Sequence, residues 1–338
     1  MILHVGAPKT GSTFLQTALW RNRERLAERG IGYPFTSARE HFAAAMDLRQ
    51  ARWGGRHDPA WDGVWDQVAM RTRDWPGRSV VISNELLGPT PPARIAHAVA
   101  SVQPAQVEVV FTARDLARQL PSEWQEQVRH NTSTSLDDMI DGLVALSDAT
   151  ELPPNAMFWR LHDPIRVLRP WADAVGADHI HVVTVPPPGA PRDLLWQRFA
   201  EAIRVEPSGF DLALANTNPS LGLVETELLR RTNELLQATS ADANPQQRRY
   251  LVRRILRSRS DQRPISLPPR HAAWAQARSA ELIEGIRAAG YHVIGDLADL
   301  QPATPTVPGE PNEVTEPEVL DAAIDAIAGL LAHTRRPQ

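Results

Sequence analysis

The sequence predicts a three-layer α/β fold in which helices flank a parallel β-sheet. Short apolar runs at residues 2–5, 79–83, 107–112 and 179–185 are typical of buried parallel strands. Longer stretches with helical spacing separate these runs, and such alternation is typical of βαβ units. Ligands of these sheets bind outside the carboxyl ends of the strands. The residues that follow each strand are therefore the first candidates for function.

The composition is that of an ordinary globular chain. Of 338 residues, 42% are hydrophobic and 22% are charged, and the formal net charge is −4. The chain has no overall excess of positive charge, which argues against a nucleic-acid partner. It has no cysteine, which excludes disulfides, thiolate metal sites and cysteine nucleophiles. We expect no membrane span, because no apolar run reaches ~20 residues, and no signal peptide before the first strand.

A glycine-bearing loop follows the first strand at once. Residues 6–13 read GAPKTGST, and apolar residues then recur with helical spacing from Phe14. Glycines let the backbone bend tightly, so that several N–H groups can point into one concavity. The helix that starts there directs its positive end to the same place. We therefore expect this loop to bind an anion of phosphate size, rather than to be an ordinary glycine turn.

The position of the lysine indicates which anion. In a nucleotide-triphosphate loop, G-x-x-x-x-G-K-[ST], the lysine follows the second glycine. Gly6 and Gly11 have that spacing, but Ser12 occupies the lysine position and the lysine lies inside the loop. The string resembles the 5′-phosphosulfate loop of sulfotransferases that use 3′-phosphoadenosine 5′-phosphosulfate (PAPS). The resemblance implies a P-loop-like fold in which the lysine reaches the oxygen between phosphate and sulfate, and in which the cofactor-binding residues are Pro8, Lys9, Thr10, Gly11, Ser12 and Thr13.

A second similarity to this family follows the strand at residues 107–112. Arg114 and Ser122 have the spacing and context of the arginine and serine that bind the 3′-phosphate in these sulfotransferases. Arginine offers a planar fork of donors for a phosphate, and a serine in the first helical turn adds a hydroxyl beside free N–H groups. The alternative is a surface arginine followed by a serine at a helix start.

Six arginines crowd the stretch between residues 247 and 259. They are either a solvated helix face, as charge runs usually are, or a source of one or two further ligands for the 3′-phosphate. Many sulfotransferases use a late Arg-Lys-Gly motif for that contact, and this chain has none. The arginines are Arg248, Arg249, Arg253, Arg254, Arg257 and Arg259.

Sulfuryl transfer to a hydroxyl needs a base that removes a proton as the oxygen attacks. The resemblance implies a base just past the strand next to the phosphate loop, where relatives carry a histidine or a glutamate. Glu85 follows the strand at residues 79–83 and is the expected general base. Alternatively its carboxylate holds Lys9 or a backbone amide in place. His41 is a further catalytic candidate, and His57 is an alternative to it.

Residues 35–78 are predicted to form a helical insert rich in tryptophan. Large aromatic residues are typical of core packing, and they also form walls of small-molecule sites. The segment is therefore either a helical layer on the sheet or a wall of the acceptor site. Its tryptophans are Trp53, Trp61, Trp65 and Trp75.

The fourth strand carries two alternating histidines. His179 and His181 would face the same side of a strand, as half of a metal site would require. No third ligand of the usual kind is evident nearby. We therefore predict no metal site.

The chain is expected to consist of one sulfotransferase-like domain and a tail. The domain covers residues 1–300, and the acidic linker at residues 301–317 contains five prolines. Residues 318–338 follow as an amphipathic helix that could dock on the domain or join a second copy into a homo-oligomer.

These features together predict a cytoplasmic sulfotransferase. It would move a sulfuryl group from PAPS to a hydroxyl or amine of a small molecule, such as a natural product, sugar, lipid or phenol, and release adenosine 3′,5′-bisphosphate (PAP). Because a sulfuryl group carries less charge than a γ-phosphoryl group, no metal is expected. One alternative is a P-loop kinase or phosphotransferase with a degenerate loop, which needs an Mg²⁺-binding carboxylate after a strand. Another is a non-catalytic nucleotide-binding scaffold.

Overall fold

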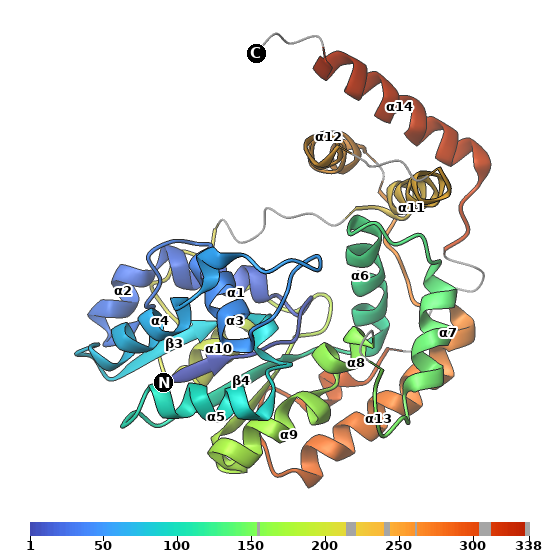
Figure 1. Ribbon diagram of the computed structural model, residues 1–338. Coiled ribbons are helices and arrows are strands. Elements are labelled where there is room, and N and C mark those ends of the chain that lie inside the picture. Colours follow the sequence, from blue (N-terminus) through green and yellow to red (C-terminus); the bar gives the residue numbers. More distant parts are fainter. Residues whose placement is uncertain (154–155, 214–220, 240–243, 261, 304–311, 335–338) are drawn as a thin grey trace. The chain divides into compact units, whose positions relative to one another are not determined.

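The computed structural model describes residues 1–153, 156–213, 221–239, 244–260, 262–303 and 312–334 (Figure 1). The chain divides into two compact units, each assembled from three stretches. The first unit comprises Met1–Leu116, Ala149–Thr217 and Gln276–Pro302. The second comprises Ala117–Asp148, Asn218–Ala275 and Ala303–Gln338. The chain thus leaves the first unit after the fourth strand and returns to it twice.

The first unit contains a six-stranded sheet in which every pair of neighbours is parallel, which confirms the predicted α/β fold. The order is β2-β3-β1-β4-β5-β6. β1, β3, β4 and β5 follow the four predicted apolar runs, whereas β6 carried no such signal. The bounds are Ile2–His4 (β1), Ile31–Gly32 (β2), Ser79–Ser83 (β3), Glu108–Ala113 (β4), Ile180–Thr184 (β5) and His292–Ile294 (β6).

Helices cover both faces of this sheet (Figure 1). Because βαβ crossovers are right-handed, helices that connect strands in one direction along the sheet lie on one face, and helices that connect strands in the other direction lie on the opposite face. The chain moves one way from β1 to β2, through α1 and α2, and the other way from β2 to β3 and β4, through α3, α4 and α5. α3, α4 and α5 pack on one another, and α5 packs on α9. The bounds are Ser12–Arg21 (α1), Arg23–Glu28 (α2), Glu40–Arg49 (α3), Val64–Arg73 (α4), Pro92–Ser101 (α5), Met157–His162 (α8), Pro164–Val175 (α9) and Leu194–Ala202 (α10).

The strand order reverses at β1. Ile2 pairs with Val81 of β3 on one side and with Glu108 of β4 on the other. After β1 the chain moves to the β2 side, and later crosses to β4 on the opposite side. Crevices that bind ligands form where the order reverses, outside the carboxyl ends of the strands. The loop after β1 therefore lies at the topological switch point.

The segment at residues 35–78 is largely helical, with α3, α4 and a short 3-10 turn between them. Trp65 is fully buried and donates through Nε1 to the Ser101 hydroxyl at 3.1 Å. Trp53, by contrast, is half exposed. At least one of the tryptophans thus belongs to the core, whereas a role as acceptor-site wall stays a prediction.

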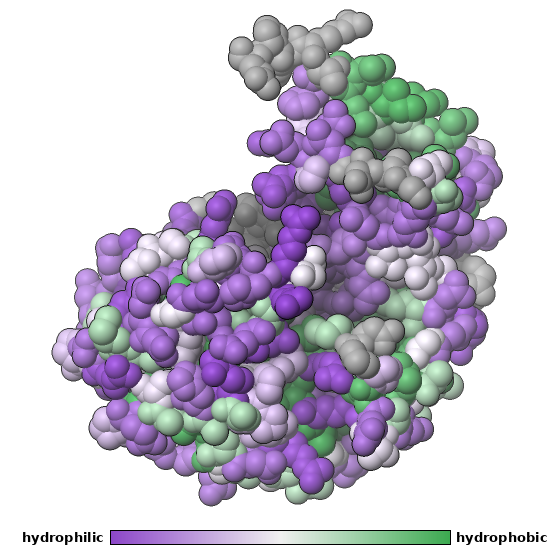
Figure 2. All heavy atoms as spheres, in the orientation of Figure 1, coloured by the Kyte–Doolittle hydropathy of each residue, from purple (hydrophilic) through white to green (hydrophobic). Residues whose placement is uncertain are grey.

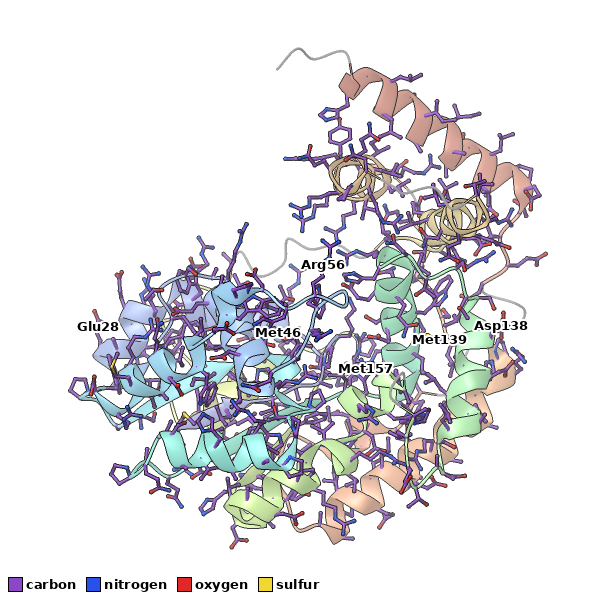
Figure 3. The ribbon with its side chains drawn as sticks, viewed as in Figure 1. Glu28, Met46, Arg56, Asp138, Met139 and Met157 are labelled. Carbon is purple, nitrogen blue, oxygen red and sulfur yellow. The ribbon has the colours of Figure 1, made fainter. Side chains whose placement is uncertain are left out.

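The described part of the second unit is helical. The Ser135 hydroxyl accepts a hydrogen bond from the N–H of Asp138 and so caps α7. Asp138 and Met139 lie on different sides of this helix (Figure 3), and Met139 is buried. The bounds are Leu116–Arg129 (α6), Leu136–Leu146 (α7), Leu223–Ala238 (α11), Pro245–Tyr250 (α12), Leu251–Ile255 (a π-helical turn, η4), Leu256–Ser258 (η5) and Glu316–Thr334 (α14), while α13 (Ala272–Ala288) runs from this unit into the first.

The predicted tail helix is present as α14. One face packs on α11 and η4, where Ala322 and Ala326 are buried and Gly329 lies against Ile255. Arg259 forms ion pairs with Asp321 and Asp325 of this helix. Hydrophobic residues gather on its outer surface (Figure 2). Residues 304–311 of the predicted linker lie outside the described residues.

Candidate anion-binding site

The loop after β1 is fixed to β4 by main-chain hydrogen bonds. The N–H groups of Val5 and Ala7 donate to the carbonyl groups of Val110 and Thr112, each at 2.9 Å. In return the N–H of Thr112 donates to the carbonyl of Gly6 at 2.6 Å. The ladder thus continues past the end of β1, so the loop starts from a rigid base.

Three residues of the loop have a positive φ: Gly6 (142°), Lys9 (62°) and Gly11 (91°). Such residues in a turn make successive N–H groups converge on one concavity. For Lys9 this conformation costs about 1 kcal/mol, a cost typical of functional loops. A Cβ added at position 11 would also lie 2.5 Å from the side chain of Leu195, which would have to shift.

Helix α1 begins directly at this concavity. Gly11 is its N-cap and contributes no side-chain hydrogen bond, and the first turn contains no acidic residue. The first N–H groups of a helix lack partners within it, and the helix dipole makes this end positive. The buried Ser12 and the exposed Thr13 add hydroxyls. The arrangement suits a phosphate-sized anion.

A buried cluster of hydroxyls supports the loop from below. The hydroxyl of Thr10 donates to the carbonyl of Ala7 at 2.6 Å and also contacts the hydroxyl of Thr112. Thr112 in turn donates to the carbonyl of Gly6 at 2.9 Å. Thr10 is therefore turned into the protein and holds the loop, and its side chain is occupied in that role.

His4 extends this cluster across three strands. Its Nδ1 lies 2.7 Å from the Ser83 hydroxyl and its Nε2 lies 3.2 Å from the Thr112 hydroxyl. Burial lowers the pKa of His4 to about 4. A neutral ring therefore links β1, β3 and β4 under the loop.

Arg114 contacts the loop directly. Its Nη1 donates to the main-chain carbonyl of Lys9 at 2.9 Å. The two residues were predicted from separate motifs, and the structure brings them together. Ser122 lies on α6 in the second unit, but the prediction that it occupies the first turn of a helix is wrong: it is the seventh of 14 residues, beyond the N–H groups that are free at a helix start. The site described here is therefore built from residues of the first unit alone.

Glu85 lies past the end of β3, in the short 3-10 turn Glu85–Leu87. Its Oε2 accepts a hydrogen bond from Nε2 of Gln16, on α1, at 2.9 Å. Burial, with the negative charge of Glu85, raises the pKa of the nearby Tyr33 phenol. The carboxylate is thus attached to the helix that starts at the anion-binding loop.

His41, on α3, is held beside Glu85. Asn84 accepts from the N–H of Leu86 through Oδ1 at 2.9 Å, which fixes its amide so that Nδ2 donates to Nδ1 of His41 at 2.8 Å. Burial lowers the pKa of His41, against the opposing effect of the Glu85 charge. His41 is therefore neutral at pH 7, with its proton on Nε2 and its lone pair engaged.

His57 has a different environment. It is exposed, its Nε2 pairs with Asp62 at 2.8 Å, and its ring lies edge-on to Trp61. Among the described residues, the contacts of His57 named above include neither the loop at residues 6–13 nor Glu85.

A hollow of about 860 Å³ lies in the same unit and begins at Gly88, three residues after Glu85. Its lining includes the first turns of α9 and part of α13. The buried carboxylate of Asp163 caps α9 and pairs with Arg166 and Arg278, at 3.3 and 3.2 Å. The hollow has the volume of a small-molecule site.

The paired histidines of the fourth apolar run lie at the amino end of the strands. His179 precedes β5, and His181 lies within it. Both contact Glu108, at 3.7 and 2.7 Å, and His181 also contacts His292 at 3.0 Å. Within the described ranges, no group of three or more histidine, aspartate or glutamate side chains is arranged to hold a metal ion.

The sequence did not single out four supporting residues: His4, Gln16, Asn84 and Thr112. Gln16 could have been found from the sequence, because it lies one turn after Ser12 on the same face of the predicted helix. The register of β1 against β4 brings His4 and Thr112 together, and the contacts of Asn84 with Leu86 and His41 are seen only in the structure.

Comparison of the chain with models of protein families, with curated proteins and with solved structures finds no match. None of the helices in the described part of the chain combines the length and apolar character needed to cross a membrane.

Proposed function

We propose that this protein transfers a sulfuryl group from PAPS to a hydroxyl or amine of a small-molecule acceptor. The observation that carries the proposal is the contact between Arg114 and the carbonyl of Lys9 at the switch point of the sheet. It joins the two phosphate-binding motifs that resemble those of sulfotransferases. The loop conformation and the start of α1 support the binding of the 5′-phosphate.

Each residue then has a defined role. When bound, PAPS supplies a sulfuryl group on a phosphate leaving group. Loop N–H groups, with Ser12 and Thr13, hold that phosphate. Lys9 offsets the charge that develops on the phosphate oxygen, which keeps the electron pair as its bond to sulfur breaks. The acceptor oxygen or nitrogen forms the new bond to sulfur and gives its proton to a base.

We assign the base to Glu85 rather than to His41. The lone pair of His41 is engaged by Asn84, so the ring would have to give up that hydrogen bond to take a proton. Glu85 accepts from Gln16 through one oxygen, and no hydrogen bond to Oε1 is found among the described residues. Glu85 therefore has acceptor capacity available, whereas the lone pair of His41 is occupied by Asn84.

We place the acceptor in the hollow of about 860 Å³ that begins at Gly88. An added Cβ on Gly88 would lie 3.3 Å from the carbonyl of Glu85, so this wall of the hollow is close to the main chain of the proposed base. The proposed compartment is the cytoplasm, because the sulfotransferase family takes its donor from the cytosol.

A thermal-shift titration tests the proposed function. PAP should raise the melting temperature without added metal, because the loop and Lys9 provide the positive charge for its phosphates. A rise with ATP and Mg²⁺ but not with PAP would instead indicate a P-loop phosphotransferase, with Glu85 as the carboxylate after a strand. No rise with either nucleotide would exclude both enzymes and favour a non-catalytic role.

We also propose that a second copy of the chain covers the outer face of α14. Its exposed apolar residues are spaced by four, three and four, as in a coiled-coil seam. Nearby carboxylates of α14 are already paired with arginines of the same unit, so the stripe itself is uncharged. The same stripe on a second copy matches it in spacing and charge. The stripe consists of Leu320, Ile324, Ile327 and Leu331, each more than half exposed.

A further inference from the structure

The second unit contains two contrasting groups of arginines. Those near α11 and α14 have carboxylate partners, for example Arg231 with Glu227 and Arg259 with Glu225. Those of α12 and the π-helical turn that follows it form no ion pair with a described residue. The second group comprises Arg248, Arg249, Arg253 and Arg254. Such a concentration of unbalanced positive charge is unexpected in a chain with a net charge of −4.

Three of these arginines, Arg248, Arg249 and Arg253, line a hollow of about 330 Å³ together with the end of α6. Arg129, His130 and Asn131 contribute the other side, and no acidic residue is among the lining. A carboxylate beside this lining is that of Glu126, which pairs with Arg129 at 2.7 Å and with His130 at 3.1 Å. Its single negative charge therefore leaves most of the guanidinium groups of the cluster uncompensated.

The cluster has a rigid base. Nη2 of Arg248 donates to the carbonyl groups of Val128 and Arg129 at the carboxyl end of α6, at 3.0 and 3.3 Å. A cation at this end of a helix is stabilised by the dipole. The buried Nε of Arg248 has no hydrogen-bond partner within the described residues. Arg248 thus fixes α12 to α6 and retains a buried donor.

The spacing of the arginines opposes the stability of their own helix. Arg249, Arg253 and Arg257 repeat every four residues, and like charges at this spacing destabilise a helix. Burial, with the charges of Arg129 and Arg253, lowers the pKa of Arg257. The π-helical turn lies in the middle of this row, and π-turns occur often at functional sites. A bound anion would relieve the repulsion.

A second hollow of about 530 Å³ adjoins the first and shares Pro245, Arg249 and Arg253 with it. Arg254 lines the second hollow but not the first. Its wall includes the rings of Tyr250 and His333, stacked with centroids 3.7 Å apart. Arg249 and Arg253 thus stand between two hollows, each within or near the volume range of a small-molecule site.

We propose that these two hollows bind one small anion that carries two or more phosphate or sulfate groups. Guanidinium groups bind the oxygens of such esters in a bidentate manner. One singly charged ion would leave most of the cluster uncompensated, whereas a multiply charged ligand can contact arginines on both sides of the shared pair.

This polyanion site is separate from the predicted contact with the PAPS 3′-phosphate. Ser122 and Arg129 lie on the same helix, α6, seven residues apart. At 1.5 Å per residue, they are about 10 Å apart along its axis. The hollow is at the carboxyl end of α6, whereas the predicted phosphate contact is at the middle of this helix.

Calorimetric titration of the full chain tests this site with two probes, inorganic tripolyphosphate and sucrose octasulfate. At least one should bind the wild type, and the tighter one identifies the group that the site prefers. Arg249→Gln/Arg253→Gln should weaken that binding roughly 100-fold, about tenfold for each arginine. Arg23→Gln/Arg287→Gln changes the net charge equally at two exposed residues of the first unit and should leave the affinity within a few-fold.

Two further measurements distinguish this site from the phosphate loop and from a general loss of stability. Lys9→Ala should retain the binding that Arg249→Gln/Arg253→Gln removes, because the phosphate loop is not involved. Without ligand, Arg249→Gln/Arg253→Gln should melt no lower than the wild type, since the substitutions relieve repulsion. The proposal is overturned if neither probe binds, if both double variants bind equally, or if inorganic phosphate binds as tightly as the probes.

Discussion

Nη1 of Arg114 donates a hydrogen bond to the main-chain carbonyl of Lys9 over 2.9 Å. The residue predicted to bind the 3′-phosphate thereby also holds the loop predicted to bind the 5′-phosphate. One guanidinium can do both, because it offers five donors in a rigid fork. Loss of Arg114 should therefore have a general effect on the loop and a specific effect on the 3′-phosphate.

Arg114→Ala separates these two effects. We expect it to weaken binding of 5′-AMP modestly and binding of PAP by a further ~2–3 kcal/mol, the scale of a charge-assisted bidentate contact. Calorimetry with the two nucleotides measures the difference. Equal losses for both would show that Arg114 supports the loop without contacting the 3′-phosphate.

Lys9 should be required for turnover but not for folding. Lys9→Ala is expected to lower the turnover number by more than ~10²-fold, the usual cost of losing one preorganised donor. Lys9→Gly should be equally inactive but about 1 kcal/mol more stable than Lys9→Ala, since glycine adopts φ 62° without strain. Steady-state rates and urea unfolding of both variants provide the test. An active Lys9→Ala protein would rule out the proposed role.

Four central strands and the loop were predictable because each leaves a local signal. A buried parallel strand is a short run of apolar residues, and the loop is a fixed spacing of glycines and lysine. β6 left no such signal, since it has three residues and begins with the exposed His292. Its strand character comes from pairing with β5, which local sequence does not specify.

The support of the site depends on the fold rather than on motifs. His4 and Thr112 are 108 positions apart, and only the register of β1 against β4 brings them together. The division into two units was likewise hidden, because the helical residues 117–148 have the periodicity of any crossover helix. Sequence patterns predicted the candidate anion-binding residues, whereas the fold determines what holds them.

The buried His4 should make stability depend on pH. Its pKa is about 4 in the folded protein, against 6.5 when exposed, so the unfolded chain binds the extra proton between these values. The free energy of unfolding therefore rises with pH across this window, and His4 alone loses about 3 kcal/mol of stability as pH falls from 7 to 4. His4→Gln cannot titrate and should flatten urea-unfolding stability over this range. His97→Gln, at a partly exposed histidine, serves as the control, and an unchanged slope in His4→Gln would contradict the assignment.

The outer face of α14 should determine the oligomeric state. Ile324→Glu/Ile327→Glu places two charges in the proposed seam, where they would be buried without partners. Sedimentation should then show a dimer for the wild type and a monomer for the variant. Glu318→Gln changes a carboxylate outside the stripe and should remain dimeric. A monomeric wild type at ~100 µM would exclude the contact.

Glu85 is held by Gln16 at 2.9 Å and lies beside a neutral His41. Glu85→Gln keeps the size of the side chain but cannot take a proton. If Glu85 is the base, turnover should fall by ~10²–10⁴-fold while the affinity for PAP stays within a few-fold, and the acidic limb of the pH–rate profile should disappear. Gln16→Leu removes only the hydrogen bond, so it should lower turnover less and retain that limb. A parallel fall in PAP affinity and turnover in Glu85→Gln would instead make Glu85 an organiser of the loop. His41→Gln, which can still accept from Asn84, would then test whether the histidine is the base.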